Sequence, residues 1–231
     1  MELLSVTNLT KTYGTGPSQV QALKGATFTM QKSEFAAIVG ESGSGKTTLL
    51  NLIGALDTPT SGQIRLNGQD LFSMPEQART IFRRRNIGFI FQSFQLIPEL
   101  TVEQNILFPL LLDYQKPDPQ KLNELLEILG LTNRRTHLPS QLSGGQQQRT
   151  AIGRALIHNP MLILADEPTG NLDSKSSQEV MDLLTRAAHH YRQTVLMITH
   201  NLGLTAYADR VLRVSDGNLT DLGGSHDEKL S

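Results

Sequence analysis

Short apolar runs alternate along this chain with longer stretches in which apolar side chains recur at every third or fourth position. The short runs predict strands and the longer stretches predict helices. At the N-terminus, Glu2–Thr10 alternates apolar and polar residues, which predicts a strand. Its inward side chains are expected to be Leu4, Val6 and Leu9. Two more strands, Val20–Leu23 and Ala26–Met30 with a turn at Lys24-Gly25, complete an expected antiparallel sheet.

The remainder of the chain follows an order typical of an α/β domain, in which apolar strands alternate with helices. Buried strands are predicted at Phe35–Val39, Ile87–Phe91, Met161–Ala165 and Thr194–Ile198. Helices are predicted at Thr48–Ile53, Pro75–Arg85, Thr150–Asn159 and Ser174–His190. Two hairpins are also expected, one at Gln63–Leu66 with Asn67-Gly68 and one that pairs Arg210–Ser215 with Asn218–Asp221.

A leucine-rich stretch, residues 95–135, differs from its surroundings and predicts two helices, Val102–Leu112 and Gln120–Leu129. We interpret it as an inserted α-helical subdomain, the plain alternative being additional core. Residues 1–94 and 136–222 are then expected to form the main domain, and residues 223–231 a tail.

Composition narrows the classes of function. The 231 residues include 21 Lys and Arg against 22 Asp and Glu, so no basic field favours nucleic acid. There is no cysteine, which excludes disulfides and cysteine metal sites. We expect no signal peptide, because the start of the sequence, residues 1–5, lacks a basic region followed by an apolar core. We also expect no membrane span, since no apolar run approaches the roughly 18 residues that a span needs. A cytoplasmic protein is therefore expected.

The motif G-x-x-x-x-G-K-[ST] occupies residues 40–47, between a predicted strand and a predicted helix. In that context the glycines turn backbone N–H groups toward an anion, and the helix directs its positive end to the same point. Lys46 is expected to reach the β- and γ-phosphates of a nucleotide, and Thr47 to offer its hydroxyl to Mg²⁺. A glycine turn with an incidental lysine is the structural alternative.

A second helix start with two glycines follows Leu142, in the sequence Ser143-Gly144-Gly145-Gln146. Glycine weakens a helix, so two together suggest that something approaches the backbone closely there. A plain capped helix start is the alternative.

Polar residues follow three of the buried strands: Gln92, the pair Asp166-Glu167, and His200. Ligands bind at the carboxyl ends of strands in α/β sheets. One carboxylate of the pair can hold Mg²⁺ through its waters, while the other accepts a proton from water. Taken alone, Gln92, His200 and Tyr13 have ordinary structural explanations. The sequence also makes Asp173 or Ser174 the cap of the following helix.

Together these motifs closely resemble those of the ATP-binding cassette (ABC) ATPases over nearly the whole chain. Residues 40–47 match Walker A, residues 142–146 the signature motif, and residues 162–166 with Glu167 the Walker B motif and its catalytic glutamate. Tyr13, Gln92, Asp173 and His200 fall at the A-loop, Q-loop, D-loop and switch histidine. The resemblance implies a P-loop NTPase core with a mostly parallel sheet, an N-terminal antiparallel β subdomain and the inserted helical subdomain.

The resemblance also implies roles for individual residues. The nucleotide would be held by Tyr13, Gly40, Glu41, Ser42, Gly43, Ser44, Gly45, Lys46, Thr47 and Thr48. Thr47, Gln92 and Asp166 would hold Mg²⁺, and Glu167, His200, Gln92 and Lys46 would take part in hydrolysis. Ser143, Gly144, Gly145, Gln146 and Asp173 would face the nucleotide of a second copy, packed head to tail.

The implied partners are that second copy and an integral membrane permease that contacts residues 95–135, at the inner face of the cell membrane. Residues 49–57, 90–98 and 165–173 are similar to the subgroup of LolD, MacB, FtsE and peptide-antibiotic resistance exporter cassettes. An importer cassette for a small solute would share every catalytic residue. A soluble ABC protein of ribosomes or chromosomes is opposed by the single cassette and the short helical insert.

Overall fold

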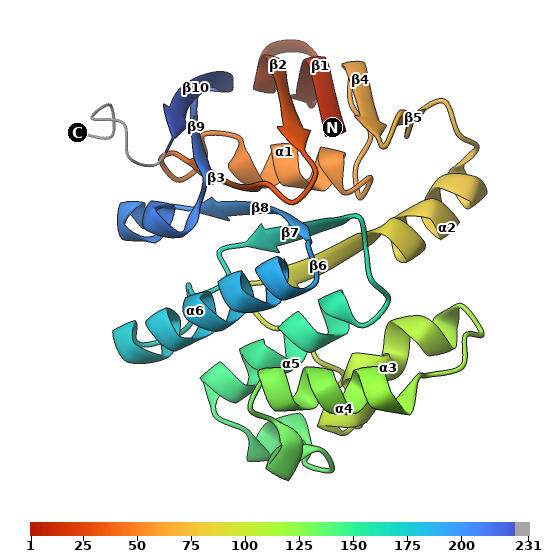
Figure 1. Cartoon of the computed structure of the whole chain (residues 1–231). Coiled ribbons are helices and arrows are strands. Elements are labelled where there is room, and N and C mark those ends of the chain that lie inside the picture. The colour runs from red at the N-terminus through yellow and green to blue at the C-terminus, as the bar shows by residue number, and fades with distance from the viewer. Residues whose placement is uncertain (225–231) are drawn as a thin grey trace. The chain divides into compact units, whose positions relative to one another are not determined.

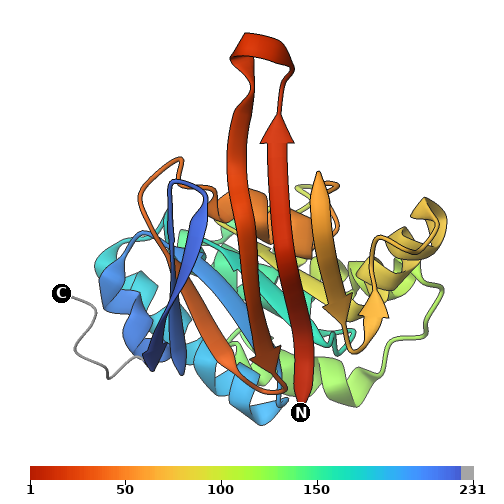
Figure 2. The same cartoon turned by 90° about the horizontal axis from the view of Figure 1, so that it is seen from above.

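The computed structural model describes residues 1–224, which form two compact units. Of the described residues, the first unit holds 1–83 and 194–224, and the second holds 84–193. Figures 1 and 2 show the elements of each unit from two directions. Helix α2 (Glu76–Asn86) carries the chain from the first unit into the second.

The first unit contains the expected antiparallel sheet, in the order β2-β1-β4-β5. Its strands are β1 (Glu2–Tyr13), β2 (Val20–Gln31), β4 (Ser61–Leu66) and β5 (Gln69–Asp70). Leu4, Val6 and Leu9 are buried, as predicted. Leu9 keeps the inward side because a bulge at Asn8, where φ is 46°, shifts the register between Val6 and Leu9.

The predicted turn at Lys24-Gly25 is wrong, because β2 is one continuous strand. Lys24 pairs with Thr10, and Ala26 pairs with Leu9. Gly25, with φ of 99°, is the extra residue between them. A glycine bulge therefore replaces the turn. The long β1–β2 hairpin projects beyond the other strands of its unit (Figure 2).

The same unit holds four further strands, ordered β10-β9-β3-β8. They are β3 (Phe35–Val39), β8 (Thr194–Thr199), β9 (Arg210–Ser215) and β10 (Asn218–Gly224). Strand β3 runs parallel to β8 and β9, and all five of its residues are buried. Helix α1 (Lys46–Ile53) buries four apolar side chains and contacts β2 and β8. Gly223 and Gly224 belong to β10 rather than to the expected tail, and residues 225–231 lie outside the described residues.

The second unit is built around α5 (Gly144–Leu156), which contacts strand β6 and helices α3 and α6. Strand β6 (Ile87–Phe91) pairs in parallel with β7 (Leu162–Asp166). The other helices are α3 (Val102–Leu112), α4 (Pro119–Ile128) and α6 (Ser174–His190). Both helices predicted for residues 95–135 are present, and α3 continues through Pro109. No helix in residues 1–224 is long and apolar enough to span a membrane.

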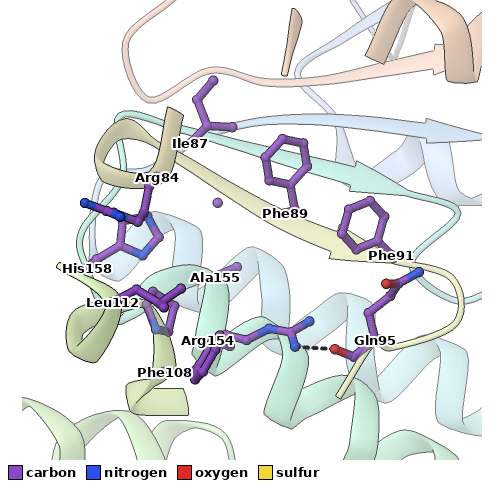
Figure 3. Close-up of a pocket in the computed structure, with 12 residues that line it drawn as sticks. Arg84, Ile87, Phe89, Phe91, Gln95, Phe108, Leu112, Arg154, Ala155 and His158 are labelled. Carbon is purple, nitrogen blue, oxygen red and sulfur yellow. Dashed lines mark hydrogen bonds between the residues drawn. The ribbon is translucent and has the colours of Figure 1, made fainter. Parts of the chain in front are cut away.

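An apolar groove of about 310 Å³ lies in this unit between β6, α3 and α5 (Figure 3). Its lining includes Phe91, Phe108, Leu112, Arg154 and His158. Leu111, Leu112 and Tyr114, at the end of α3, are exposed. Arg84 and Arg85 pair with Asp113, and their hydrogen bonds lower the pKa of that carboxyl to about 2.

His158 makes the stability of this unit sensitive to pH. Burial lowers its pKa to about 4, and neither ring nitrogen has a hydrogen-bond partner among the described residues. The positive charge of Lys121 adds to this lowering of the pKa. The ordinary pKa is 6.5, so the unfolded chain binds this proton more readily than the folded chain between pH 6.5 and 4.

We therefore expect His158 to lower the free energy of unfolding by about 2 kcal/mol when the pH falls from 7 to 5. His158→Leu should remove that part of the pH dependence, measured by urea unfolding at both pH values. Exposed His189 provides the matched control, His189→Leu. Equal pH dependence in the wild type and the His158 variant would contradict the prediction.

Candidate functional site: a phosphate loop and a carboxylate pair

The loop of residues 40–45 is pressed against neighbouring backbone at both ends. Gly45 has φ of 111°, and a Cβ added there would lie 2.4 Å from the Ala22 carbonyl oxygen. A Cβ on Gly40 would lie 2.1 Å from the Val214 carbonyl oxygen. Only glycine fits these positions, and the loop is therefore held in one shape between β2 and β9.

Lys46 lies within this loop and is 7% exposed. Its Nζ donates to the carbonyl oxygens of Gly40 and Glu41, at 2.8 and 2.7 Å. An ammonium group has three donors, so one is left for an anion. Because its partners are neutral carbonyls, the positive charge also remains uncompensated, as a phosphate site requires.

Two hydroxyls beside Lys46 fit the same ligand. Ser44 Oγ is buried and has no hydrogen-bond partner in the described part of the chain. Thr47 is exposed on the first turn of α1. A hydroxyl, together with a carboxylate and phosphate oxygens, is the kind of ligand set that Mg²⁺ takes, because the ion keeps several waters and uses few protein ligands. The described residues contain no group of three or more His, Cys, Asp or Glu side chains that could hold a metal ion.

The other predicted residues of the first unit are Tyr13, Thr48 and His200. Tyr13 is 42% exposed at the end of β1, and its hydroxyl donates to Asp57 at 2.8 Å. Thr48 follows Thr47 in α1. His200 follows β8 and lines a cavity of about 460 Å³ together with Gly40 and Glu41. The structure thus brings His200 to the phosphate loop.

In the second unit, the parallel register places Phe91 opposite Asp166. Gln92 and Glu167, the next residues, therefore leave the same edge of the strand pair. Glu167 has a left-handed backbone, with φ of 46°. Strain of this kind in a non-glycine residue concentrates at functional sites.

Three residues that the sequence analysis missed hold this edge in place. Asn171 exchanges two hydrogen bonds with Gln92, at 3.1 and 3.0 Å. Buried Gln148 donates to the carbonyl oxygen of Pro168, directly after Glu167. Arg154 donates to the carbonyl oxygen of Gln95 (Figure 3) and to that of Phe94. The spacing of residues in the sequence does not predict such contacts, because each joins a side chain to a loop that is distant in the chain.

Comparison with known proteins identifies the family. A model described as ABC transporter matches residues 23–170, more than half of the chain. The chain belongs to this family. It is 47% identical to the lipoprotein-releasing system ATP-binding protein LolD of Geobacter metallireducens, over 94% of this chain and 97% of that protein.

Two further comparisons cover nearly the whole chain. It is 43% identical to the macrolide export ATP-binding/permease protein MacB of Chlorobaculum tepidum, over 99% of this chain but 35% of that protein. The ATP-binding cassette MJ0796, solved as a post-hydrolysis dimer bound to ADP and Pi, superposes with a TM-score of 0.84 and 38% identity. That match covers 96% of this chain and 100% of the other. The expected fold, a P-loop NTPase core with an antiparallel β sheet and helices, is confirmed.

In this ABC ATPase, the polar residues of the signature motif hydrogen-bond to each other at the start of their own helix. Ser143 caps α5 and forms a capping box with Gln146, so the plain structural explanation accounts for both. We expect something to approach the backbone of the two glycines closely. At Gly144 this is the Leu172 side chain of the same chain, which would lie 3.1 Å from an added Cβ. Gly145 has only an ordinary contact, at 3.7 Å from Ser176.

Asp173 is the cap of α6, as predicted, and accepts hydrogen bonds from the N–H groups of Lys175 and Ser176. Hydrogen bonding from Ser176 lowers the pKa of its carboxyl. The nucleotide-facing roles of Ser143, Gly144, Gly145, Gln146 and Asp173 therefore rest on the family resemblance.

The crowding at Gly45 gives a direct test of the phosphate loop. We expect Gly45→Ala to destabilise the protein by roughly 2–5 kcal/mol, because it combines a left-handed alanine with a backbone clash. Gly43→Ala is the matched control: its φ is 78°, but no atom lies within 4 Å of the added Cβ. It should cost only about 1–2 kcal/mol. Chemical denaturation measures both, and equal losses would contradict the crowding argument.

Proposed function

We propose that this ABC cassette binds and hydrolyses ATP with its phosphate loop and drives a membrane permease. The observation that carries the proposal is Lys46, a buried ammonium group whose partners among residues 1–224 are the loop's own carbonyl oxygens. In this site Lys46 binds the β- and γ-phosphates, and backbone N–H groups of residues 40–48 surround them. The Tyr13 ring stacks on adenine.

Thr47, Asp166 and Gln92 would hold Mg²⁺, directly or through its waters. When bound, the ion neutralises negative charge on the β- and γ-phosphate oxygens. Glu167 accepts a proton from the attacking water as the water oxygen bonds to the γ-phosphorus. The bond from that phosphorus to the bridging oxygen breaks, and ADP and phosphate leave. His200 holds the γ-phosphate and the water in line.

We further propose that a second copy completes each nucleotide site, a proposal supported by the dimeric structures of the similar cassette MJ0796. The start of α5 supports this: Ser143 is exposed there, and the helix N-terminus directs its positive end outward. Asp173 belongs to the same dimer contact.

The permease is proposed to contact the inserted helical subdomain, residues 95–135, and the apolar groove beside it in the second unit. The exposed side chains Leu111, Leu112 and Tyr114 support such a contact. This contact would hold the protein at the cytoplasmic face of the membrane. The similarity to LolD and MacB favours export or force transmission over solute import. A nucleic acid is not among the proposed partners.

Two substitutions separate binding from hydrolysis. Lys46→Ala should abolish turnover, because it removes the cation that faces the phosphates. Glu167→Gln should retain ATP binding but lose about 10²–10⁴ in rate, because an amide cannot accept the proton. Steady-state ATPase and equilibrium nucleotide binding measure both effects. Exposed Lys32→Ala and Glu179→Gln are the controls. An active Lys46→Ala enzyme would refute the proposal, and parallel loss of affinity and rate in Glu167→Gln would make Glu167 a binding residue.

The dimer has its own test. With hydrolysis blocked by Glu167→Gln, Mg²⁺ and saturating ATP should convert monomer to dimer, which light scattering detects as a doubling of mass. Adding Ser143→Arg should prevent the dimer while leaving ATP binding by the monomer intact, since Ser143 faces the other copy's nucleotide. A protein that binds ATP and stays monomeric would count against the composite site.

A further inference from the structure

Lys11 and Tyr13 meet on one face of β1. They lie two residues apart in a strand, so their side chains point to the same side. Lys11 Nζ lies over the Tyr13 ring, 4.7 Å from its centroid. The lysine side chain is only 12% exposed, whereas Tyr13 is 42% exposed. One face of the ring is therefore covered by a fixed cation, and the ring still offers surface to a ligand.

Asp57 holds both of these side chains. One of its oxygens accepts from Lys11 Nζ at 2.6 Å, and the other accepts from the Tyr13 hydroxyl at 2.8 Å. Lys11 also donates to the Thr58 carbonyl oxygen at 2.6 Å. The three side chains thus form a closed triangle of two hydrogen bonds and one cation–π contact.

The loop that carries Asp57 is anchored to two elements. Thr60 N–H donates to the Thr10 carbonyl oxygen at 3.0 Å, and the Thr60 hydroxyl accepts from Thr12 N–H at 2.9 Å. These bonds join the loop to β1. Asp57 N–H donates to the carbonyl oxygen of Asn51, in α1, at 3.3 Å. Asp57 therefore links the strand that carries Tyr13 to the helix that begins with Lys46 and Thr47.

The charges of the cluster are settled by its contacts. Burial raises the pKa of the Asp57 carboxyl, but hydrogen bonds from Lys11 and Tyr13 outweigh it and leave the pKa below its usual range. Burial and the hydrogen bond to Asp57 raise the pKa of the Tyr13 hydroxyl. At neutral pH, Asp57 is thus a carboxylate and Tyr13 is a neutral donor to it.

We propose that Asp57 and Lys11 are positioning residues of the adenine site, which fix the Tyr13 ring at a set distance and angle from the phosphate loop. The inference rests on the proposed function, because it assumes that Tyr13 stacks on the base. A ring free to rotate about χ1 and χ2 would lose that freedom when adenine binds. The Asp57–Lys11 pair restricts rotation of the Tyr13 ring before the nucleotide binds. One rigid unit therefore binds both the base and the phosphates.

This role predicts an effect confined to ligands that carry a base. Lys11→Met and Asp57→Ala should raise KM for ATP and the inhibition constant of ADP by about five- to fiftyfold. This loss is part of the affinity that stacking a base on an aromatic ring supplies. The kcat should stay near that of the wild type, since neither residue touches the γ-phosphate. Inorganic tripolyphosphate, which binds the phosphate loop without a base, should inhibit the variants and the wild type equally.

Three further variants sharpen the experiment. Lys11→Arg keeps the cation and should remain close to the wild type. Tyr13→Phe removes only the hydroxyl that Asp57 holds, so it should show the same base-specific loss and add little to Asp57→Ala in the double variant. This substitution also replaces Asp57→Ala if that variant proves unstable. Asp221→Asn, at an aspartate paired with Arg210 in the same unit, is the control and should leave all constants unchanged.

Two results would overturn the inference: unchanged ADP inhibition in the Lys11 and Tyr13 variants, or an equal loss for ADP and tripolyphosphate, which would indicate general disruption of the loop. Failure of the proposed function would be seen differently. In that case the wild type would not hydrolyse ATP, or Lys46→Ala would remain active.

Discussion

The close approach of three glycines to neighbouring backbone is the constraint on which the site depends. Gly40 and Gly45 press the phosphate loop against carbonyl oxygens of Val214 and Ala22. Gly217, in the turn between β9 and β10, would likewise place a Cβ 2.9 Å from Ala22. Its N–H donates to the Ser44 carbonyl oxygen, and its own carbonyl oxygen accepts from Lys24 N–H. The β9–β10 hairpin thus contacts a loop that lies far away in sequence and helps to hold the backbone of that loop in place.

Strand register supplies the second constraint, in the other unit. Strands β6 and β7 pair in parallel, with Phe91 opposite Asp166. This register alone brings the amide of Gln92 and the carboxylates of Asp166 and Glu167 to one edge of the sheet. The left-handed backbone of Glu167 then directs the chain away from the strand, and a bond from Gly170 N–H to the Glu167 carbonyl oxygen closes that turn. The cost of this conformation, about 1–3 kcal/mol, is offset by buried contacts such as the Gln148 side chain bound to Pro168.

The sequence predicted most elements and all the motifs, because both rest on local signals. Apolar runs mark strands such as Ile87–Phe91, and the cap Asp173 marks the start of α6. The prediction failed at Gly25, where pairing with β1 continues across a glycine that resembles a turn. It also missed Asp57, Gln148, Arg154 and Asn171, because each acts through a contact with a residue remote in the chain. The nucleotide-facing roles of Tyr13, Gln92, His200 and the residues after Leu142 came from the resemblance, since spacing alone cannot distinguish a capped helix at Ser143 from a nucleotide contact.

Buried Lys46 and half-buried Arg154 show how shielded cations are used here. In the described part of the chain, each bonds to carbonyl oxygens and neither has a carboxylate within ion-pair distance. For Lys46, under the proposed function, the uncompensated charge would serve a phosphate. Burial lowers the pKa of Arg154, so its position is costly, and its two partners, Phe94 and Gln95, both have left-handed backbones. The guanidinium therefore holds a strained segment in place. That segment joins Gln92 to Gln95 in the groove of the second unit. Under the proposed function, a partner that displaced Gln95 would have to break its bond to Arg154 or shift Gln92, which would connect the groove to the strand edge that carries Gln92 and Glu167.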